Sequence, residues 1–119
     1  MRKYCSHVVV ENFFEPCVLF LLSQKKSYGY ELMQELSSKC TCRVNVANLY
    51  RGLARLEKST MVIKKKVKGE RGPSKIVYEI TNQGKNLLSE WILELEEQNR
   101  AISKLINNYK KINDTGNKQ

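Results

Sequence analysis

The sequence is poor in the residue patterns on which most enzyme active sites are built. It has a single histidine, His7, no phosphate-binding glycine loop, and no spaced pair of carboxylates beside other catalytic residue types. These absences leave acid–base, nucleophilic and phosphate-transfer chemistry without an obvious set of residues. We therefore expect a protein that is not an enzyme and needs no cofactor.

The sequence also lacks a long hydrophobic run. The apolar residues 8–10 are followed by Glu11 and Asn12, and the run at residues 17–22 is far shorter than the roughly 20 residues of a membrane-spanning helix. No targeting signal is visible, so we expect a cytoplasmic protein whose cysteines are reduced thiols. The four cysteines are Cys5, Cys17, Cys40 and Cys42.

Acidic residues are scarce in the middle of the chain. The whole chain has 21 lysines and arginines against 12 aspartates and glutamates, a formal net charge of +9. Between residues 43 and 75, ten basic residues stand against only Glu57 and Glu70, a net charge of +8. Such a local excess predicts a surface that binds a polyanion. A membrane surface fits less well, because no long apolar face accompanies the charge.

Residues 45–58, NVANLYRGLARLEK, have the pattern of an amphipathic helix. Leu49, Leu53 and Leu56, with Val46 beside them, recur at helical spacing and predict a face turned to the core. Asn45 can cap the helix by accepting a hydrogen bond from a first-turn amide. The opposite face, which could meet DNA or simply be solvated, carries Asn48, Arg51, Arg55 and Lys58.

Two shorter helices are predicted before this basic helix. The first begins at Pro16 and ends near Gln24, and the second covers residues 28–38 with Ser27 as its cap. In the basic helix, Gly52 lowers helix stability relative to alanine, so its presence indicates close packing against a neighbour. Three short helices with a basic third helix are typical of a helix-turn-helix module, here preceded by an arm or short helix at residues 1–14.

A β-hairpin is predicted after the basic helix. Residues 61–67 and 76–80 are rich in β-branched and aromatic side chains, and the segment KGERGPSK between them has strong turn residues. Lysines on one side of the first strand could grip DNA phosphates, or could merely protect an exposed strand. The basic candidates of this hairpin are Lys64, Lys66, Lys68, Arg71 and Lys75.

The C-terminal third reads as one long helix over residues 82–112, capped by Thr81 and followed by a frayed polar tail at residues 113–119. Its apolar residues repeat every seven positions, which favours pairing with a second copy over folding back on the same chain. Asn99 is the polar interruption that can fix the register of such a pair. The predicted dimer interface consists of Leu88, Trp91, Ile92, Leu95, Asn99, Ile102, Ile106 and Tyr109.

Three motifs in this order resemble those of PadR-family transcriptional regulators of the short type with a single C-terminal helix. The sequence reads GYEL at residues 29–32 and LYRGLARLE at residues 49–57. A wing signature follows, formed by Gly72, Pro73, Tyr78, Thr81 and Gly84. The resemblance runs from about Glu15 to Glu96. The helix entry departs from the family pattern, with Val46, Ala47 and Asn48 in place of Pro, Gly and Thr.

The resemblance implies a fold that is mainly α with a small β-hairpin, namely a winged helix-turn-helix domain at residues 15–81 plus a C-terminal dimerisation helix. It also implies a homodimeric repressor of double-stranded operator DNA, with the basic helix in the major groove and Tyr50 on the DNA backbone. In relatives, aromatic residues of the last helix line a pocket for small apolar or aromatic effectors. Trp91 is the corresponding candidate here.

Two alternatives stay open at this point. Cys40 and Cys42, with Cys5 and His7, could form a thiol-based metal or redox sensor, and Arg43 could lower the pKa of a neighbouring thiol. The spacing does not match the usual structural zinc sites, so no metal is expected. A winged helix with a basic face could also bind RNA, although exposed aromatic pairs for base stacking are not evident.

Overall fold

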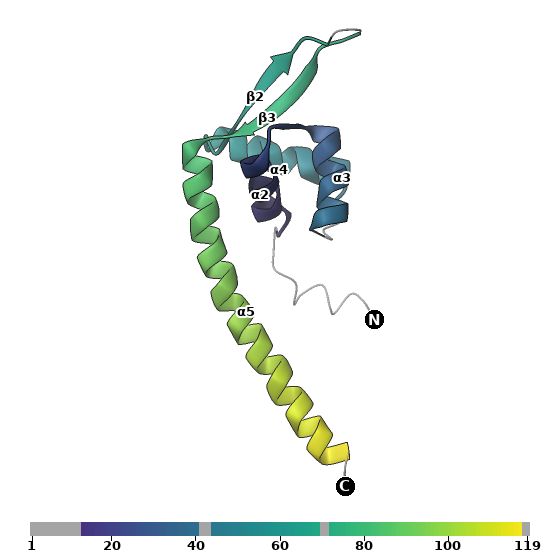
Figure 1. Cartoon of the computed structure of the whole chain (residues 1–119), viewed down its shortest axis with the longest axis vertical. Coiled ribbons are helices and arrows are strands. Elements are labelled where there is room, and N and C mark those ends of the chain that lie inside the picture. The colour runs from purple at the N-terminus through teal and green to yellow at the C-terminus, as the bar shows by residue number, and fades with distance from the viewer. Residues whose placement is uncertain (1–12, 41–43, 70–71, 118–119) are drawn as a thin grey trace. The chain divides into compact units, whose positions relative to one another are not determined.

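The computed structural model describes residues 13–40, 44–69 and 72–117 of the 119 residues. Most of them are helical, and a small antiparallel sheet completes the fold, which confirms the predicted fold class (Figure 1). Residues 1–12 of the predicted arm, which include Cys5 and His7, lie outside the described residues. So do Cys42, Arg43 and Arg71. In this described part of the chain, no helix is both long and apolar enough to span a lipid bilayer.

Helix α2 (Phe14–Gln24) supplies much of the core. Val18, Leu19 and Leu21 are almost completely buried. The helix begins at Phe14 and not at Pro16, where the sequence predicted its start. Proline is tolerated inside the first turn because the amides there have no partner within the helix, so its missing N–H costs little.

Helix α3 (Gly29–Lys39) buries Leu32 and Leu36 completely. The prediction that Ser27 caps this helix is wrong. Ser27 and Tyr28 instead form a short strand, β1 (Ser27–Tyr28), and the Glu31 carboxylate accepts a hydrogen bond from the Tyr28 N–H at 2.9 Å. A serine in an extended segment can satisfy its backbone by pairing with a strand, which here replaces capping.

Helix α4 (Val46–Lys58) begins as predicted, because the Asn45 side-chain oxygen accepts a hydrogen bond from the Asn48 N–H at 2.8 Å. Leu49, Leu53 and Leu56 are buried, which confirms the predicted core face. Val46 is 57% exposed, so its assignment to that face is wrong. It is the first residue of the helix, and the core covers α4 only from Leu49 onward.

The sheet has three strands in the order β1-β3-β2, with β2 (Val62–Val67) and β3 (Lys75–Ile80) forming the predicted hairpin. The sequence predicted only these two strands. Strand β1 pairs with β3, so that Ser27 lies opposite Tyr78 and Tyr28 opposite Val77. The hairpin is therefore attached to the helical domain through β3, whose other edge carries β2.

Helix α5 (Asn82–Asn117) begins after Thr81, whose hydroxyl accepts a hydrogen bond from the Gly84 N–H at 3.0 Å as predicted for a cap. The chain divides into two compact units at residues 88 and 89, so the first turns of α5 belong to the unit that contains α2 to β3. The helix continues to Asn117, beyond residue 112, where the sequence predicted a frayed tail. Extending an existing helix needs no new nucleation and adds one hydrogen bond per residue, so a helix can continue past its last apolar residue.

Candidate nucleic-acid interface

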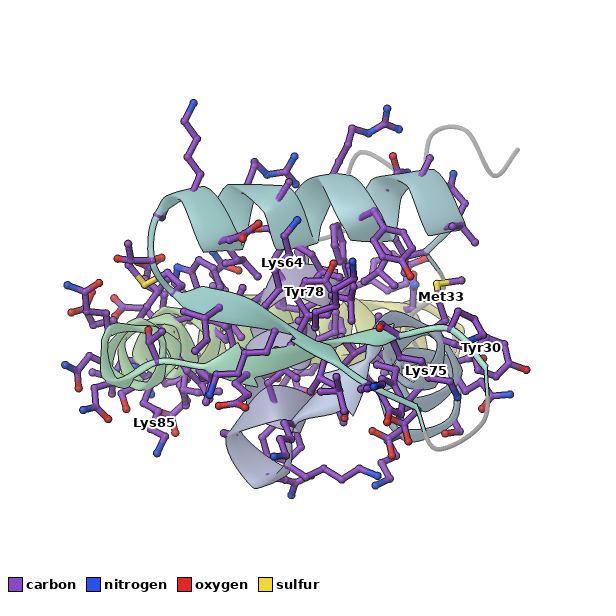
Figure 2. The ribbon with its side chains drawn as sticks, turned by 90° about the horizontal axis from the view of Figure 1, so that it is seen from above. Tyr30, Met33, Lys64, Lys75, Tyr78 and Lys85 are labelled. Carbon is purple, nitrogen blue, oxygen red and sulfur yellow. The ribbon has the colours of Figure 1, made fainter. Side chains whose placement is uncertain are left out.

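The outer face of α4 is exposed along the whole helix. Asn48, Arg51, Arg55 and Lys58 all lie on this face, opposite the buried leucines. Figure 2 shows long side chains with nitrogen tips extending from α4 away from the sheet. A helix with one buried apolar face and one exposed basic face has the dimensions and donors needed to read the major groove of DNA.

Arg51 is held by a neighbour on the same face. Its Nη2 donates a hydrogen bond to the Asn48 side-chain oxygen at 2.6 Å. A guanidinium has five N–H donors in a fixed planar fork, so the remaining donors are available to a base edge. The pair therefore presents one prealigned polar group instead of two mobile side chains.

Arg55 makes a contact within the protein that its sequence position did not predict. Its guanidinium forms an ion pair with the Glu15 carboxylate of α2, in which Nε lies 3.1 Å from Oε2 and Nη2 also contacts this oxygen. Glu15 is 8% exposed, whereas about half of the Arg55 side chain reaches solvent. Arg55 thus holds α4 against α2, and only its outer edge is available to a phosphate. The sequence did not reveal this contact, because Glu15 lies 40 positions away.

Tyr50 enters a cavity of about 500 Å³ between α3, α4 and β3. The approach is so close that a Cβ at Gly29 would lie 2.2 Å from the Tyr50 hydroxyl oxygen, so a larger residue at position 29 would require the Tyr50 ring to shift. The cavity brings Tyr50 together with Lys75, two of the predicted DNA-binding residues. Its lining consists of Tyr28, Tyr30, Glu31, Tyr50, Lys75, Ile76 and Tyr78.

Lys75 is oriented by an aromatic ring. Its Nζ lies 5.1 Å from the centre of the Tyr28 ring, a cation–π contact between β3 and β1. Figure 2 shows Lys75 beside Tyr30 at the end of the sheet. The short strand β1, which the sequence did not predict, thereby positions a predicted basic residue.

Tyr78 also lines this cavity and is 6% exposed. Burial raises the pKa of the Tyr78 phenol above its usual value, and the nearby Tyr50 and Glu57 raise it further. The phenol therefore stays neutral and able to donate a hydrogen bond. Figure 2 places Tyr78 between the sheet and α4.

The lysines of β2 divide between the two faces of the sheet. Lys64 and Lys66 lie opposite Tyr78 and Ile76, and Lys65 lies opposite Val77. Lys64 pairs with Glu57 of α4 at 3.6 Å, and Lys65 pairs with Glu79 at 3.5 Å. Lys66 has no carboxylate within salt-bridge distance among the residues that the structure describes, and Lys68 is exposed beyond the end of β2.

The predicted dimer residues lie along α5 with substantial apolar exposure. Ile92, Ile102, Ile106 and Tyr109 are between 41% and 65% exposed, and Asn99 is exposed as well. Leu88, Trp91 and Leu95 are partly exposed. Leu105 and Ile112 are also highly exposed and continue the seven-residue spacing of Trp91, so the apolar stripe is wider than the sequence predicted.

Of the residues in the cysteine alternative, Cys5, His7 and Cys42 lie outside the described residues. Cys40 ends α3 and is partly buried. Within residues 13–40, 44–69 and 72–117, no three histidine, cysteine, aspartate or glutamate side chains gather into a metal site. The sensor remains a prediction.

Comparisons with known proteins agree with this geometry. Residues 18–90 match the transcriptional regulator PadR-like family. An uncharacterised protein from Lysinibacillus sphaericus is 30% identical over 96 residues, covering 79% of this chain and 88% of that protein. A PadR-like transcriptional regulator from Bacillus cereus is 27% identical, with a TM-score of 0.68 and coverage of 77% and 89%. PadR from Bacillus subtilis, solved with operator DNA, is 19% identical and shares the fold, with a TM-score of 0.60 and coverage of 66% and 45%.

Proposed function

Since this chain belongs to the PadR-like family of transcriptional regulators, we propose that it binds double-stranded operator DNA, with α4 in the major groove and the β2–β3 hairpin as the wing. The observation that carries the proposal is the exposed face of Asn48, Arg51 and Lys58 over a buried leucine stripe. The Bacillus subtilis relative, whose structure contains operator DNA, supports the choice of DNA as the partner.

The proposed contacts divide into two kinds. Arg51, prealigned by Asn48, is the candidate for reading a base edge. Tyr50, Lys75 and the wing lysines Lys66 and Lys68 are candidates for phosphate contacts, which add affinity without sequence preference. Arg71 is proposed for the same task from its place in the sequence alone.

We further propose that the protein acts as a homodimer through α5. The exposed stripe of isoleucines supports this, because burying it against a second copy would remove a long apolar surface from water. A two-fold dimer can place two recognition helices roughly 34 Å apart, one turn of DNA. We also propose that it acts in the cytoplasm.

The repressor role and the effector are proposals as well. A small apolar or aromatic molecule bound beside Trp91 would release DNA if it preferred a dimer arrangement that does not fit the operator. Trp91 is partly buried and flanks the seven-residue stripe, a position from which a ring can contact both a ligand and a partner helix.

The test is fluorescence anisotropy with the DNA upstream of the protein's own gene and with a scrambled fragment, across a salt series. Preference for the native fragment with two protomers per site is expected. Arg51→Ala should cost about 1–3 kcal/mol at the base that Arg51 reads. Lys104→Ala, which removes an exposed charge on α5, is the matched control and should change little.

Equal, weak binding to both fragments by the wild type would contradict the proposal and would direct attention to RNA. Unchanged affinity and sequence preference in Arg51→Ala would show that α4 is not the reading helix.

A further inference from the structure

Thr81 and Gly84 belong to the wing signature of the sequence, yet neither lies in α4 or in the hairpin. Thr81 is the residue between β3 and α5, and Gly84 lies in the first turn of α5. Both contact the turn that ends α4, at residues 59–61. Their role is therefore to hold the C-terminal end of α4.

The turn at the end of α4 is a closed hydrogen-bonded unit. The Met61 N–H donates to the Leu56 carbonyl at 2.8 Å, and the Thr60 N–H donates to the Glu57 carbonyl at 2.9 Å. This is the Schellman arrangement, in which the residue after the cap is left-handed and usually glycine. Thr60 occupies that position with φ of 63°, so a β-branched residue is kept where its backbone is disfavoured.

The carbonyls of the same turn are held by the start of α5. The Thr81 N–H donates to the Met61 carbonyl at 3.0 Å. The Thr81 hydroxyl oxygen lies 2.6 Å from the Thr60 carbonyl oxygen and 3.0 Å from that of Met61, and it also accepts the Gly84 N–H. One hydroxyl thus caps α5 and bonds the end of α4 at once.

Two further contacts tighten the junction. A Cβ at Gly84 would lie 2.2 Å from the Met61 carbonyl oxygen, so the first turn of α5 can approach the turn this closely only with glycine. The Thr60 side chain also contacts the Gln83 side-chain oxygen, which gives the threonine a role that glycine could not fill. Side chains and backbone therefore join α4 to α5 directly, without passing through the hydrophobic core.

We infer that this junction, formed by Thr60, Thr81 and Gly84, sets which spacing between operator half-sites the protein accepts. The inference rests on the proposed function, in which α5 pairs with a second copy and α4 reads DNA. Because α4 is bonded to the first turn of α5, the junction links each recognition helix to the residues at which the proposed dimer helix begins. The three residues are positioning residues that need not touch DNA.

The experiment measures affinity for a series of DNA fragments in which one or two base pairs are inserted or removed between the half-sites of the footprinted operator. Each base pair moves one half-site by roughly 3.4 Å and rotates it around the duplex. The wild type should lose roughly tenfold in affinity or more at a two-base-pair change, since recognition helices held by this junction would not follow the shifted half-site.

Thr81→Val keeps the shape of the side chain and removes the hydroxyl. It should reduce the penalty for altered spacing to less than about threefold, while Thr81→Ser, the matched control, should keep the wild-type profile. Gln83→Ala changes an exposed residue, spares the cap, and should give an intermediate profile. It serves as the second variant if Thr81→Val folds poorly in urea denaturation.

The wild-type spacing profile in both Thr81→Val and Gln83→Ala would overturn the inference and leave the proposed function intact. So would a wild-type dimer that binds all spacings equally. Failure of the wild type to prefer its operator would overturn the proposed function itself, and the inference with it.

Discussion

Gly52 lets α4 pack closely against α2. A Cβ at this position would lie 2.6 Å from the Phe14 ring, which confirms the close packing predicted from the sequence. Gly52→Ala should therefore lower the free energy of unfolding by about 1–3 kcal/mol through overpacking. This loss is expected although alanine is the better helix former by about 1 kcal/mol. Urea denaturation monitored by circular dichroism measures it.

The second variant, Phe14→Leu, makes room for the added methyl group. In that background Gly52→Ala should cost less, because the smaller side chain leaves the Cβ unopposed. A double-mutant cycle gives the coupling between the two positions. Additive effects would mean that the ring of Phe14 is not what the methyl group meets.

Tyr78 makes the free energy of unfolding depend on pH in the alkaline range. Its phenol has a raised pKa in the folded chain, so on unfolding it loses its proton more readily. The contribution of the Tyr78 phenol to the free energy of unfolding is therefore fully present below about pH 10 and is lost as the pH rises above that value. Tyr78→Phe should lose less unfolding free energy than the wild type between about pH 9 and 11, measured by urea denaturation. Parallel losses in the two proteins would assign the effect to the other tyrosines.

At the scale of elements, the lysines of the β2–β3 hairpin differ in whether they are paired with carboxylates. Lys66 shares a sheet face with Tyr78 and has no described carboxylate partner, whereas Lys65 lies on the other face and pairs with Glu79. Lys66→Ala should weaken binding to operator and scrambled DNA alike and reduce the slope of log affinity against log salt by about one. Lys65→Ala is the control with the same loss of charge and should change the slope less. Equal slopes in the two variants would argue against a wing that grips phosphate with the face of Lys66.

Periodicity predicted the elements whose signal is local. The spacing of Leu49, Leu53 and Leu56 and the cap at Asn45 placed α4 correctly, and the alternating residues around the turn placed β2 and β3. Strand β1 has only two residues, and what makes it a strand is its pairing with Tyr78 and Val77, about 50 residues away. No local pattern carries that information.

The candidate site was also predicted only in its local features. Helical spacing identified the residues on the outer face of α4, and the structure shows them exposed there. Helical spacing could not show that Arg55 forms an ion pair with Glu15, because Glu15 lies in another helix. The cavity around Tyr50 was missed for the same reason, since its lining comes from four separate elements.

At the scale of the whole molecule, the proposed dimer depends on the exposed apolar stripe of α5. Ile106 is 45% exposed on the seven-residue stripe. Ile106→Asp should convert the proposed dimer to a monomer, because a charge buried in a coiled-coil seam is strongly disfavoured. Sedimentation velocity over a concentration series measures the change.

Lys104→Asp is the control for this substitution. It lies two positions from Ile106 on the same helix, outside the seven-residue stripe, and carries a larger change in charge. It should leave the sedimentation of the dimer unchanged. A wild type that sediments as a monomer at all concentrations would contradict the proposed dimer, and operator binding by a monomeric Ile106→Asp would show that pairing is not required.

The two unlike faces of α4 separate the residues that keep the protein folded from the residues proposed to read DNA. Leu49, Gly52, Leu53 and Leu56 are fixed by packing, whereas Asn48, Arg51 and Lys58 project from the fold and contribute little to its stability. Exposed positions can therefore be exchanged while the domain remains intact. With α4 as the proposed reading helix, a descendant of this protein could acquire a new target sequence by changing a few surface residues, and a designer could change its target sequence in the same way.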